Sequence, residues 1–261
     1  MKYLLSLLGL ILFCVGMTLH NTASFKAEQM KYERVRRAFK EKMPLVQELY
    51  AMRGLQADSQ EIYLRAFKEE QVLELWARTA APDTFRLMKT YPFCRTSGCI
   101  GPKRICGDKQ VPEGFYHINE FNPVSKYYLS LGINYPNQSD RILGSKVNTG
   151  GDIFIHGNCV SIGCISITDD MIKELYVIAV EAAAAGQQHI PTHIFPCRMT
   201  DKNLGLLQTN YGKDSAMVAF WKNMKTGYDL FEISKLVPVV GVDKKTGKYK
   251  FNNIYPNGSG M

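Results

Sequence analysis

The chain has 261 residues, of which 46% are apolar and 21% charged, and its formal net charge at pH 7 is +8. This apolar fraction excludes a wholly disordered protein, and the length suits one large domain or a domain with an appendage. Seven cysteines are too few for a disulfide-built scaffold, and their odd number indicates at least one free thiol. The positive charge allows nucleic acid, an anionic membrane or an anionic polymer as partner, or simply a solvated basic surface, and selects none.

The first 24 residues have the layout of an export signal. Lys2 precedes a nearly unbroken apolar run from Leu4 to Leu19, and the small residues Thr22-Ala23-Ser24 follow it. The run is shorter than the roughly 20 residues of a comfortable membrane span. We therefore interpret residues 1–24 as a cleaved signal peptide or an uncleaved N-terminal anchor. Both place the remaining chain outside the cytoplasm and limit membrane contact to this segment.

Residues 25–57 predict a helical spacer. From 26 to 42 the sequence is charged with scattered apolar positions, which is typical of a weakly amphipathic helix. Pro44 is expected to interrupt this helix, and the pattern resumes over 45–52 before Gly54 ends it. We expect a solvated helix that holds the main domain off the membrane.

Residues 58–252 form the predicted main domain, and 253–261 a flexible tail. A polar turn between two apolar runs predicts a β-hairpin over 62–67 and 72–76. Further strands rich in branched and aromatic residues are expected at 84–90, 114–118, 126–133, 152–156 and 190–195, with a final hairpin over 237–251. Helices are expected over 169–185 and 215–224. Strands predominate, so the predicted class is mainly β with inserted helices (α+β).

The most informative stretch runs from His156 to Cys164. A His ends a strand, and a tight turn containing glycine leads to a Cys. Attack on an acyl carbon needs a thiolate and a base within hydrogen-bond reach, and this stretch can place both in one pocket. The backbone amide of Cys164 is a candidate oxyanion donor, and Gly163 would let the backbone approach a substrate closely. Spacing alone leaves a buried structural Cys as the commoner alternative.

These residues resemble the L,D-transpeptidase catalytic domain family, the YkuD-type fold, and within it the YafK-like branch. The family pattern is a His-Gly at a strand end, here His156-Gly157, and a Ser-x-Gly-Cys turn, here Ser161 to Cys164. Segments 107–116, 125–140 and 186–199 also look like members of this branch. The resemblance covers roughly residues 60–200.

The resemblance implies a YkuD-like β-sandwich catalytic domain that acts on peptidoglycan stem peptides in the periplasm or cell envelope of a bacterium. Cys164 would attack a carbonyl of meso-diaminopimelate and form a thioester, which an amine or water resolves. His156 would activate the thiol and protonate the leaving amine, while Gly157, Ser161 and Gly163 shape the oxyanion turn. No cofactor, metal ion or nucleic acid is implied.

Two positions depart from the wider family. Ile162 stands where many members have a second His, and Ser166 stands where many have an Arg that holds a substrate carboxylate. The spacing from His156 to Ser161 is also short. The YafK-like branch shares these departures and includes an amidase that detaches an envelope protein from peptidoglycan. Hydrolysis therefore remains beside transfer onto an amine, and a non-catalytic peptidoglycan-binding module is a further alternative. An NlpC-type arrangement would instead pair Cys164 with His189 or His193.

Three more residues are candidates for substrate contacts. Tyr116 and Tyr135 either line the cleft or simply pack on their strands, and Arg198 either replaces the missing carboxylate-binding Arg or has a surface role.

The remaining cysteines leave their pairing open. Two of Cys94, Cys99 and Cys106, which share one loop, can pair in an oxidising compartment, and a zinc site lacks an obvious fourth ligand. Cys159 is interpreted as a small buried residue, with a redox partner as the alternative. The disulfide pairing among Cys94, Cys99, Cys106, Cys159 and Cys197 is therefore not decided by the sequence.

Overall fold

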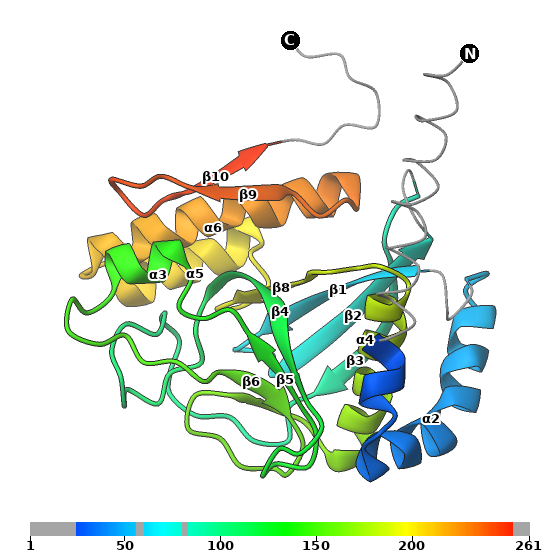
Figure 1. Ribbon diagram of the computed structural model, residues 1–261. Helices are drawn as coiled ribbons and strands as arrows, with labels where there is room; N and C mark the ends of the chain where they lie inside the picture. The colour runs from blue at the N-terminus through cyan, green and yellow to red at the C-terminus, as the bar shows by residue number, and fades with distance from the viewer. Residues whose placement is uncertain (1–24, 56–59, 80–82, 253–261) are drawn as a thin grey trace, which may run out of the picture.

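The computed structural model describes residues 25–55, 60–79 and 83–252. The predicted export segment 1–24 and tail 253–261 lie outside the described residues. The helices are α2 (Glu33–Ala51), α3 (Gln138–Leu143), α4 (Asp169–Ala184), α5 (Asp201–Tyr211) and α6 (Ser215–Ser234). The strands are β1 (Gln60–Phe67), β2 (Val72–Thr79), β3 (Arg86–Pro92), β4 (Gly114–Asn122), β5 (Ser130–Ile133), β6 (Phe154–His156), β7 (Ile165–Ser166), β8 (Ile190–Phe195), β9 (Val239–Val242) and β10 (Tyr249–Asn252) (Figure 1).

The centre of the fold is one mixed eight-stranded sheet with the order β3-β2-β1-β8-β4-β5-β6-β7. The predicted first hairpin is confirmed, with β1 and β2 antiparallel from Gln60 opposite Thr79 to Phe67 opposite Val72. Strand β8 joins this hairpin in parallel to β1 and pairs antiparallel with β4. The final hairpin, β9 with β10, forms a separate two-stranded sheet.

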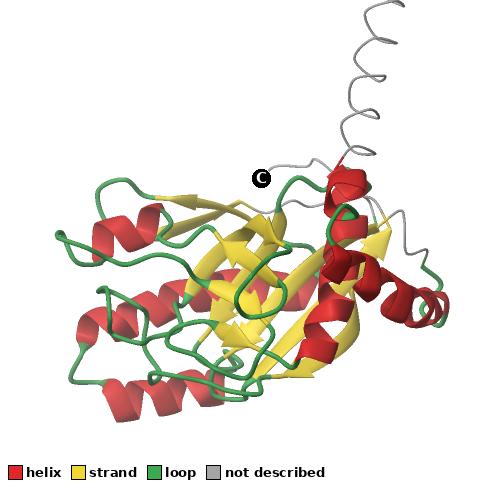
Figure 2. Cartoon of the chain, turned by 60° about the horizontal axis from the view of Figure 1, so that its bottom comes forward, coloured by secondary structure: helices red, strands yellow, loops and turns green. Residues whose placement is uncertain are grey.

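The sheet curls so that the chain just beyond β3 reaches β7 at the opposite edge of the sheet. Beyond the end of β3, the backbone amide of Cys94 donates to the carbonyl of Ser166 in β7 at 2.9 Å, and Arg95 forms an antiparallel bridge with the same residue. The sheet is therefore a half-barrel whose closure lies beside β7. Helices flank it on both sides (Figure 2), which confirms the predicted α+β class.

Alternate residues of β1 supply the two cores. Ile62 and Leu64 point into the cluster shared with α2 and α4, whereas Tyr63 and Phe67 pack in clusters with residues of α6. All four side chains are fully buried. This is the side-chain alternation of a strand covered on both faces, and it explains why β1 is buried along almost its whole length.

Helix α4 follows β7 directly and is the helix that the sequence predicts most clearly. The Thr168 hydroxyl accepts a hydrogen bond from the Met171 amide, and Asp169 and Asp170 supply negative charge to the first turn. Its apolar stripe is buried against the sheet, and its residues Ile172, Leu175 and Ile178 are fully buried. The helix start is thereby anchored next to the turn that contains Cys164.

The prediction of a solvated spacer, broken at Pro44, is wrong. Helix α2 continues through Pro44 and lies beside α4 (Figure 1), where Val35, Ala38 and Val46 are fully buried in the core that α4 shares. Lys42 adds an ion pair with Asp170 at 2.5 Å. The weak apolar stripe of this helix therefore has a partner that lies more than a hundred residues further along the chain.

This packing predicts a difference between two adjacent residues of α2. Val46 is fully buried and Leu45 is 49% exposed. We expect Val46→Ala to lower the free energy of unfolding by about 2 kcal/mol, because it removes two buried methyl groups and leaves a cavity. Leu45→Ala should change it by less than about 0.5 kcal/mol. Urea unfolding of both variants measures the difference, and equal values would mean that α2 is not part of the core.

Two helices were not predicted, and both begin at capping residues. At α3 the Asn137 side chain and the Asp140 side chain each accept from the other's backbone amide, and at α5 the Thr200 hydroxyl accepts from the Asn203 amide. Helix α6 also continues beyond the predicted end at Met224. Among the described residues, no helix combines the length and the hydropathy required to cross a membrane.

Candidate active site

The register of two short parallel strands sets the predicted nucleophile and the predicted base on neighbouring strand positions. Strand β6 pairs with β7 so that Ile155 faces Ile165 and His156 faces Ser166. Continued by one residue, this register sets Cys164 opposite Phe154. Because side chains alternate along a strand, His156 and Cys164 share one face of the strand pair, displaced by two residues.

His156 is held as a neutral base. Its ring is 1% exposed, and its Nδ1 lies 2.5 Å from the carbonyl oxygen of Gly157. A carbonyl only accepts, so Nδ1 carries the proton and Nε2 keeps its lone pair. The Tyr127 ring stacks on the imidazole with centroids 4.6 Å apart. Burial lowers the pKa of His156 below its ordinary value, which favours the neutral form at pH 7.

Cys164 is a half-buried free thiol. Its Sγ donates to the carbonyl oxygen of Asp152 at 3.7 Å, and no hydrogen bond to His156 is found in this conformation of the described residues. Burial raises the pKa of the Cys164 thiol, and the Lys103 ammonium opposes that shift. The thiol is therefore protonated at neutral pH and needs a base to react.

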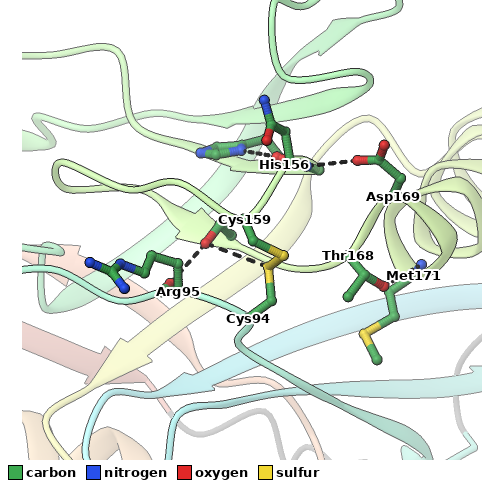
Figure 3. Close-up of a disulfide and its surroundings, with 10 residues drawn as sticks. Cys94, Arg95, His156, Cys159, Thr168, Asp169 and Met171 are labelled. Carbon is green, nitrogen blue, oxygen red and sulfur yellow. Dashed lines mark hydrogen bonds between the residues drawn. A yellow bond between two sulfur atoms is a disulfide. The ribbon is translucent and has the colours of Figure 1, made fainter.

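Residues 157–163, which we call the catalytic loop, connect the two side chains. Gly157 packs so closely against the start of α4 that an added Cβ would lie 2.5 Å from Asp169 Oδ1. The same Asp169 oxygen accepts from the Asn158 amide at 2.7 Å (Figure 3). A glycine at 157 is thus required by close packing, and Asp169 holds the start of the loop.

The end of the loop is a tight turn into Cys164. The Ser161 hydroxyl donates to the Cys164 carbonyl at 2.8 Å and lies 3.3 Å from the Gly163 amide. Gly163 has a φ of +132° and contacts the Gln110 carbonyl, where an added Cβ would lie 3.1 Å away. In the part of the chain that the structure describes, the Cys164 amide has no hydrogen-bond acceptor. This amide is available as an oxyanion donor.

The structure decides the cysteine pairing that the sequence left open. Cys94 forms a disulfide with Cys159, with the two Cα atoms 5.3 Å apart (Figure 3), while Cys99 and Cys106 are exposed free thiols. Cys159 is itself exposed, so the interpretation as a small buried residue is wrong. The pairing spans 65 residues of sequence and depends on the meeting of β3 and β7, which no local pattern reveals.

The two candidate tyrosines lie in the interior. Tyr116 is 3% exposed and its hydroxyl donates to Asp140 Oδ2 at 3.0 Å, while Tyr135 is 6% exposed and donates to the Thr149 carbonyl at 2.9 Å. Both hydroxyls are engaged within the protein, so the structure assigns these side chains to packing and contradicts the predicted lining of the cleft.

Arg198 does not replace the missing carboxylate-binding Arg. Its guanidinium forms an ion pair with Glu74 of β2 at 2.6 Å and stacks over the Phe67 ring of β1. Its charge is thus neutralised by the first hairpin. Ser166, at the family's Arg position, is fully buried and donates to the Arg95 carbonyl at 2.8 Å.

The NlpC-type pairing of Cys164 with His193 is excluded by the geometry. His193 is buried on β8, where its Nδ1 lies 2.7 Å from the Tyr63 hydroxyl and its ring contacts Phe115. Burial lowers the pKa of His193 to about 3, so it is a neutral structural residue. Among the described residues, no group of three His, Cys, Asp or Glu side chains could hold a metal ion.

Three residues near the site were missed by the sequence analysis. Tyr127 stacks on the His156 ring, and Asp169 holds the start of the catalytic loop. Lys103 is a buried ammonium that pairs with Asp108 at 2.5 Å. Only Asp169 could have been found from a local sequence pattern, because it is an acidic residue at the start of the helix that follows the Cys164 turn. The other two reach the site from distant loops.

Comparisons with known proteins identify the family of this chain. The family model described as "L,D-transpeptidase catalytic domain" (YkuD) matches residues 86–185. The chain is 38% identical over 183 residues to YafK of Escherichia coli (strain K12), which is provisionally named an L,D-transpeptidase; the match covers 69% of this chain and 70% of YafK.

Two solved structures match part of this chain at lower similarity. The helical cell shape determining protein Pgp2 (K307A mutant) of Campylobacter jejuni has 22% identity and a TM-score of 0.43, and the match covers 66% of this chain and 60% of Pgp2. Bd1075 of Bdellovibrio bacteriovorus has 22% identity and a TM-score of 0.38, with 67% and 61% covered. This chain therefore spans less than two thirds of either protein. On the family model and the likeness to YafK, the chain belongs to the YkuD-type L,D-transpeptidase catalytic domain family.

Proposed function

We propose that this protein is a cysteine L,D-transpeptidase that acts on stem peptides containing meso-diaminopimelate, through a thioester on Cys164, in cell wall biogenesis. One observation carries the proposal. His156 and Cys164 lie on one face of the β6–β7 pair, and the Nδ1 of His156 is committed to the Gly157 carbonyl. This arrangement leaves Nε2 free to act as a base toward a thiol on the same face once the thiol leaves the Asp152 carbonyl.

The first half-reaction forms the thioester. The Cys164 thiol leaves the Asp152 carbonyl, passes its proton to His156 Nε2, and its sulfur attacks the carbonyl carbon of diaminopimelate. The Cys164 amide donates a hydrogen bond to the carbonyl oxygen and so stabilises the negative charge that develops there. The carbon–nitrogen bond then breaks, and His156 returns the proton to the departing amine.

The second half-reaction releases the acyl group from sulfur. An amine of a second stem peptide attacks the thioester, His156 takes its proton, and the thiol is restored. Attack by water in the same position gives a carboxylate, which is hydrolysis. The same residues serve both outcomes, so the acceptor and not the catalytic pair decides the product.

Hydrolysis is the second candidate function. Ser166 is buried and bonded to Arg95, so the family's usual carboxylate-binding position carries no cation here. Together with the likeness to YafK, this supports an amidase that releases a protein or amino acid attached to diaminopimelate. A peptidoglycan-attached envelope protein would then be the partner.

The proposed setting is the periplasm or cell envelope. It rests on the signal-like sequence of residues 1–24, and the net charge of +8 suits a protein beside an anionic wall polymer. We assign residues 58–252 to the catalytic domain. Helix α2 is included in the packed body because it shares the core of α4.

Product analysis tests the function. The purified protein is incubated with peptidoglycan that carries tetrapeptide stems, and the digest is examined by mass spectrometry. New 3–3 cross-links are expected for transfer, and free tripeptide or a released protein without new links for hydrolysis. If neither product forms while Cys164 remains an intact thiol, the protein is a binding module and the proposal is wrong.

A further inference from the structure

The catalytic loop has little burial of its own to hold it in place. Val160 is 44% exposed and Ile162 is 75% exposed, although both are large apolar side chains. Asn158 has a φ of +56°, which is uncommon for a residue other than glycine. Apolar packing therefore contributes little to the loop's shape, and its conformation depends on the bonds that tie it to neighbouring segments.

Two of those ties end on the same short segment, residues 94–97. Cys159 is bonded covalently to Cys94, and the Ser161 hydroxyl lies 3.0 Å from the Ser97 hydroxyl. Figure 3 shows the disulfide bridging the loop to this segment beside His156. The loop is thus attached at its middle, where neither β6 nor α4 contacts it through a described hydrogen bond.

The segment 94–97 is itself attached to the strand that follows the nucleophile. The Cys94 amide donates to the Ser166 carbonyl at 2.9 Å, and the Ser166 hydroxyl donates to the Arg95 carbonyl at 2.8 Å. The catalytic loop and β7 therefore share one support. A displacement of the loop relative to β7 would turn the peptide unit between Gly163 and Cys164, whose amide is the candidate oxyanion donor.

We propose that the Cys94–Cys159 disulfide is a positioning element for acyl transfer at Cys164. It holds the catalytic loop against residues 94–97 so that the Cys164 amide faces the developing oxyanion. The proposal rests on the proposed cysteine acyltransferase function. It does not extend to the thiol and the base themselves. Asp169 holds the start of the loop, where the Gly157 carbonyl and the Tyr127 ring fix His156, and the Asp152 carbonyl fixes the sulfur.

This division of roles gives a test with two reagents. Alkylation of Cys164 by iodoacetamide is a displacement at a saturated carbon and forms no oxyanion. Acylation of Cys164 by a carbapenem β-lactam passes through a tetrahedral oxyanion. A positioning role predicts that loss of the disulfide slows acylation and leaves alkylation nearly unchanged, whereas general destabilisation slows or accelerates both.

The variant is C94A/C159A, and the matched control is C99A/C106A, which removes two exposed free thiols and no bond. We expect C94A/C159A to acylate about 10²-fold more slowly, as after loss of an aligned oxyanion donor. Its alkylation rate at Cys164, followed by peptide mapping, should change by less than about threefold. The control should match the wild type in both reactions.

Reduction of the wild-type protein provides the same comparison without substitution. A water-soluble phosphine cleaves the exposed disulfide to two thiols and becomes the phosphine oxide with an oxygen from water. The reduced protein should show the same selective loss of acylation, and reoxidation should restore it. This experiment decides the matter if C94A/C159A does not fold, as judged by near-UV circular dichroism.

The outcomes separate the two proposals. Unchanged acylation without the disulfide, or an equal change in acylation and alkylation, overturns the positioning role alone. Absence of any Cys164 acylation in the untreated wild-type protein overturns the proposed acyltransferase function, and the positioning role with it.

Discussion

Replacement of Cys164 by alanine is expected to lower kcat on stem peptides by roughly 10⁴-fold or more, because no thioester can form. The KM and the fold should change little, since Cys164 is half-buried and its thiol bonds only to the backbone of the neighbouring segment at Asp152 and Phe154 among the described residues. Steady-state turnover, with intact-mass detection of the acyl-enzyme, measures the effect.

The matched control for Cys164→Ala is Cys197→Ala. Cys197 is also a free cysteine of the main domain, but it is 5% exposed and burial raises the pKa of its thiol to about 12. Turnover by C197A should stay within about twofold of wild type, because this thiol is neither ionised nor accessible. If C197A lost turnover while C164A retained it, Cys197 and not Cys164 would be the nucleophile.

The second large effect is expected for His156→Ala, with a loss of about 10²- to 10⁴-fold in kcat/KM from removal of the general base. The pH profile identifies the role. Burial lowers the pKa of His156, so the imidazole stays neutral and active to a lower pH than an ordinary His. The acid limb of the wild-type profile should therefore have its midpoint below about pH 6.5.

In H156A this acid limb should disappear. The remaining rate should rise with pH until the Cys164 thiol ionises without help, above its usual range because burial raises the pKa of that thiol. His189→Ala is the control, since His189 is exposed and lies outside the β6–β7 pair. An H156A profile with the wild-type acid limb would show that another group is the base.

The elements that sequence predicted best are those whose pattern is complete within a few residues. The β1–β2 hairpin has two apolar runs around a polar turn, and α4 has a capping Thr168, an acidic first turn and a regular apolar stripe. The same holds for β8, which was expected over its exact range. In each of these elements, the conformation that the local sequence favours is also the one that packs against its neighbours in the fold.

The error at α2 has the opposite origin. Its apolar positions are sparse, and Pro44 favours a break, so local preference alone describes a solvated, interrupted helix. Burial of Val35, Ala38 and Val46 against α4, together with the ion pair of Lys42, outweighs that preference. No pattern within the helix indicates a partner so far along the chain.

The candidate substrate residues failed for a related reason. A Tyr on a strand and an Arg after a strand have the same sequence appearance whether they face a cleft or the interior. Tyr116 is directed to Asp140 of α3, and Arg198 to Glu74 of β2, only because the fold brings these distant elements together. Exposure and the identity of the ionic partner are properties of the assembled fold.

By itself, the sequence determined the family and the candidate pair: a His at a strand end and a Cys after a glycine turn lie close along the chain, so one short strand pair is enough to set them on one face. Tertiary structure alone decided the surroundings of that pair. The curling of the sheet brings Cys94 to Cys159 across 65 residues and attaches the catalytic loop to β7. Such long-range contacts depend on the packing of whole elements, which no local spacing encodes.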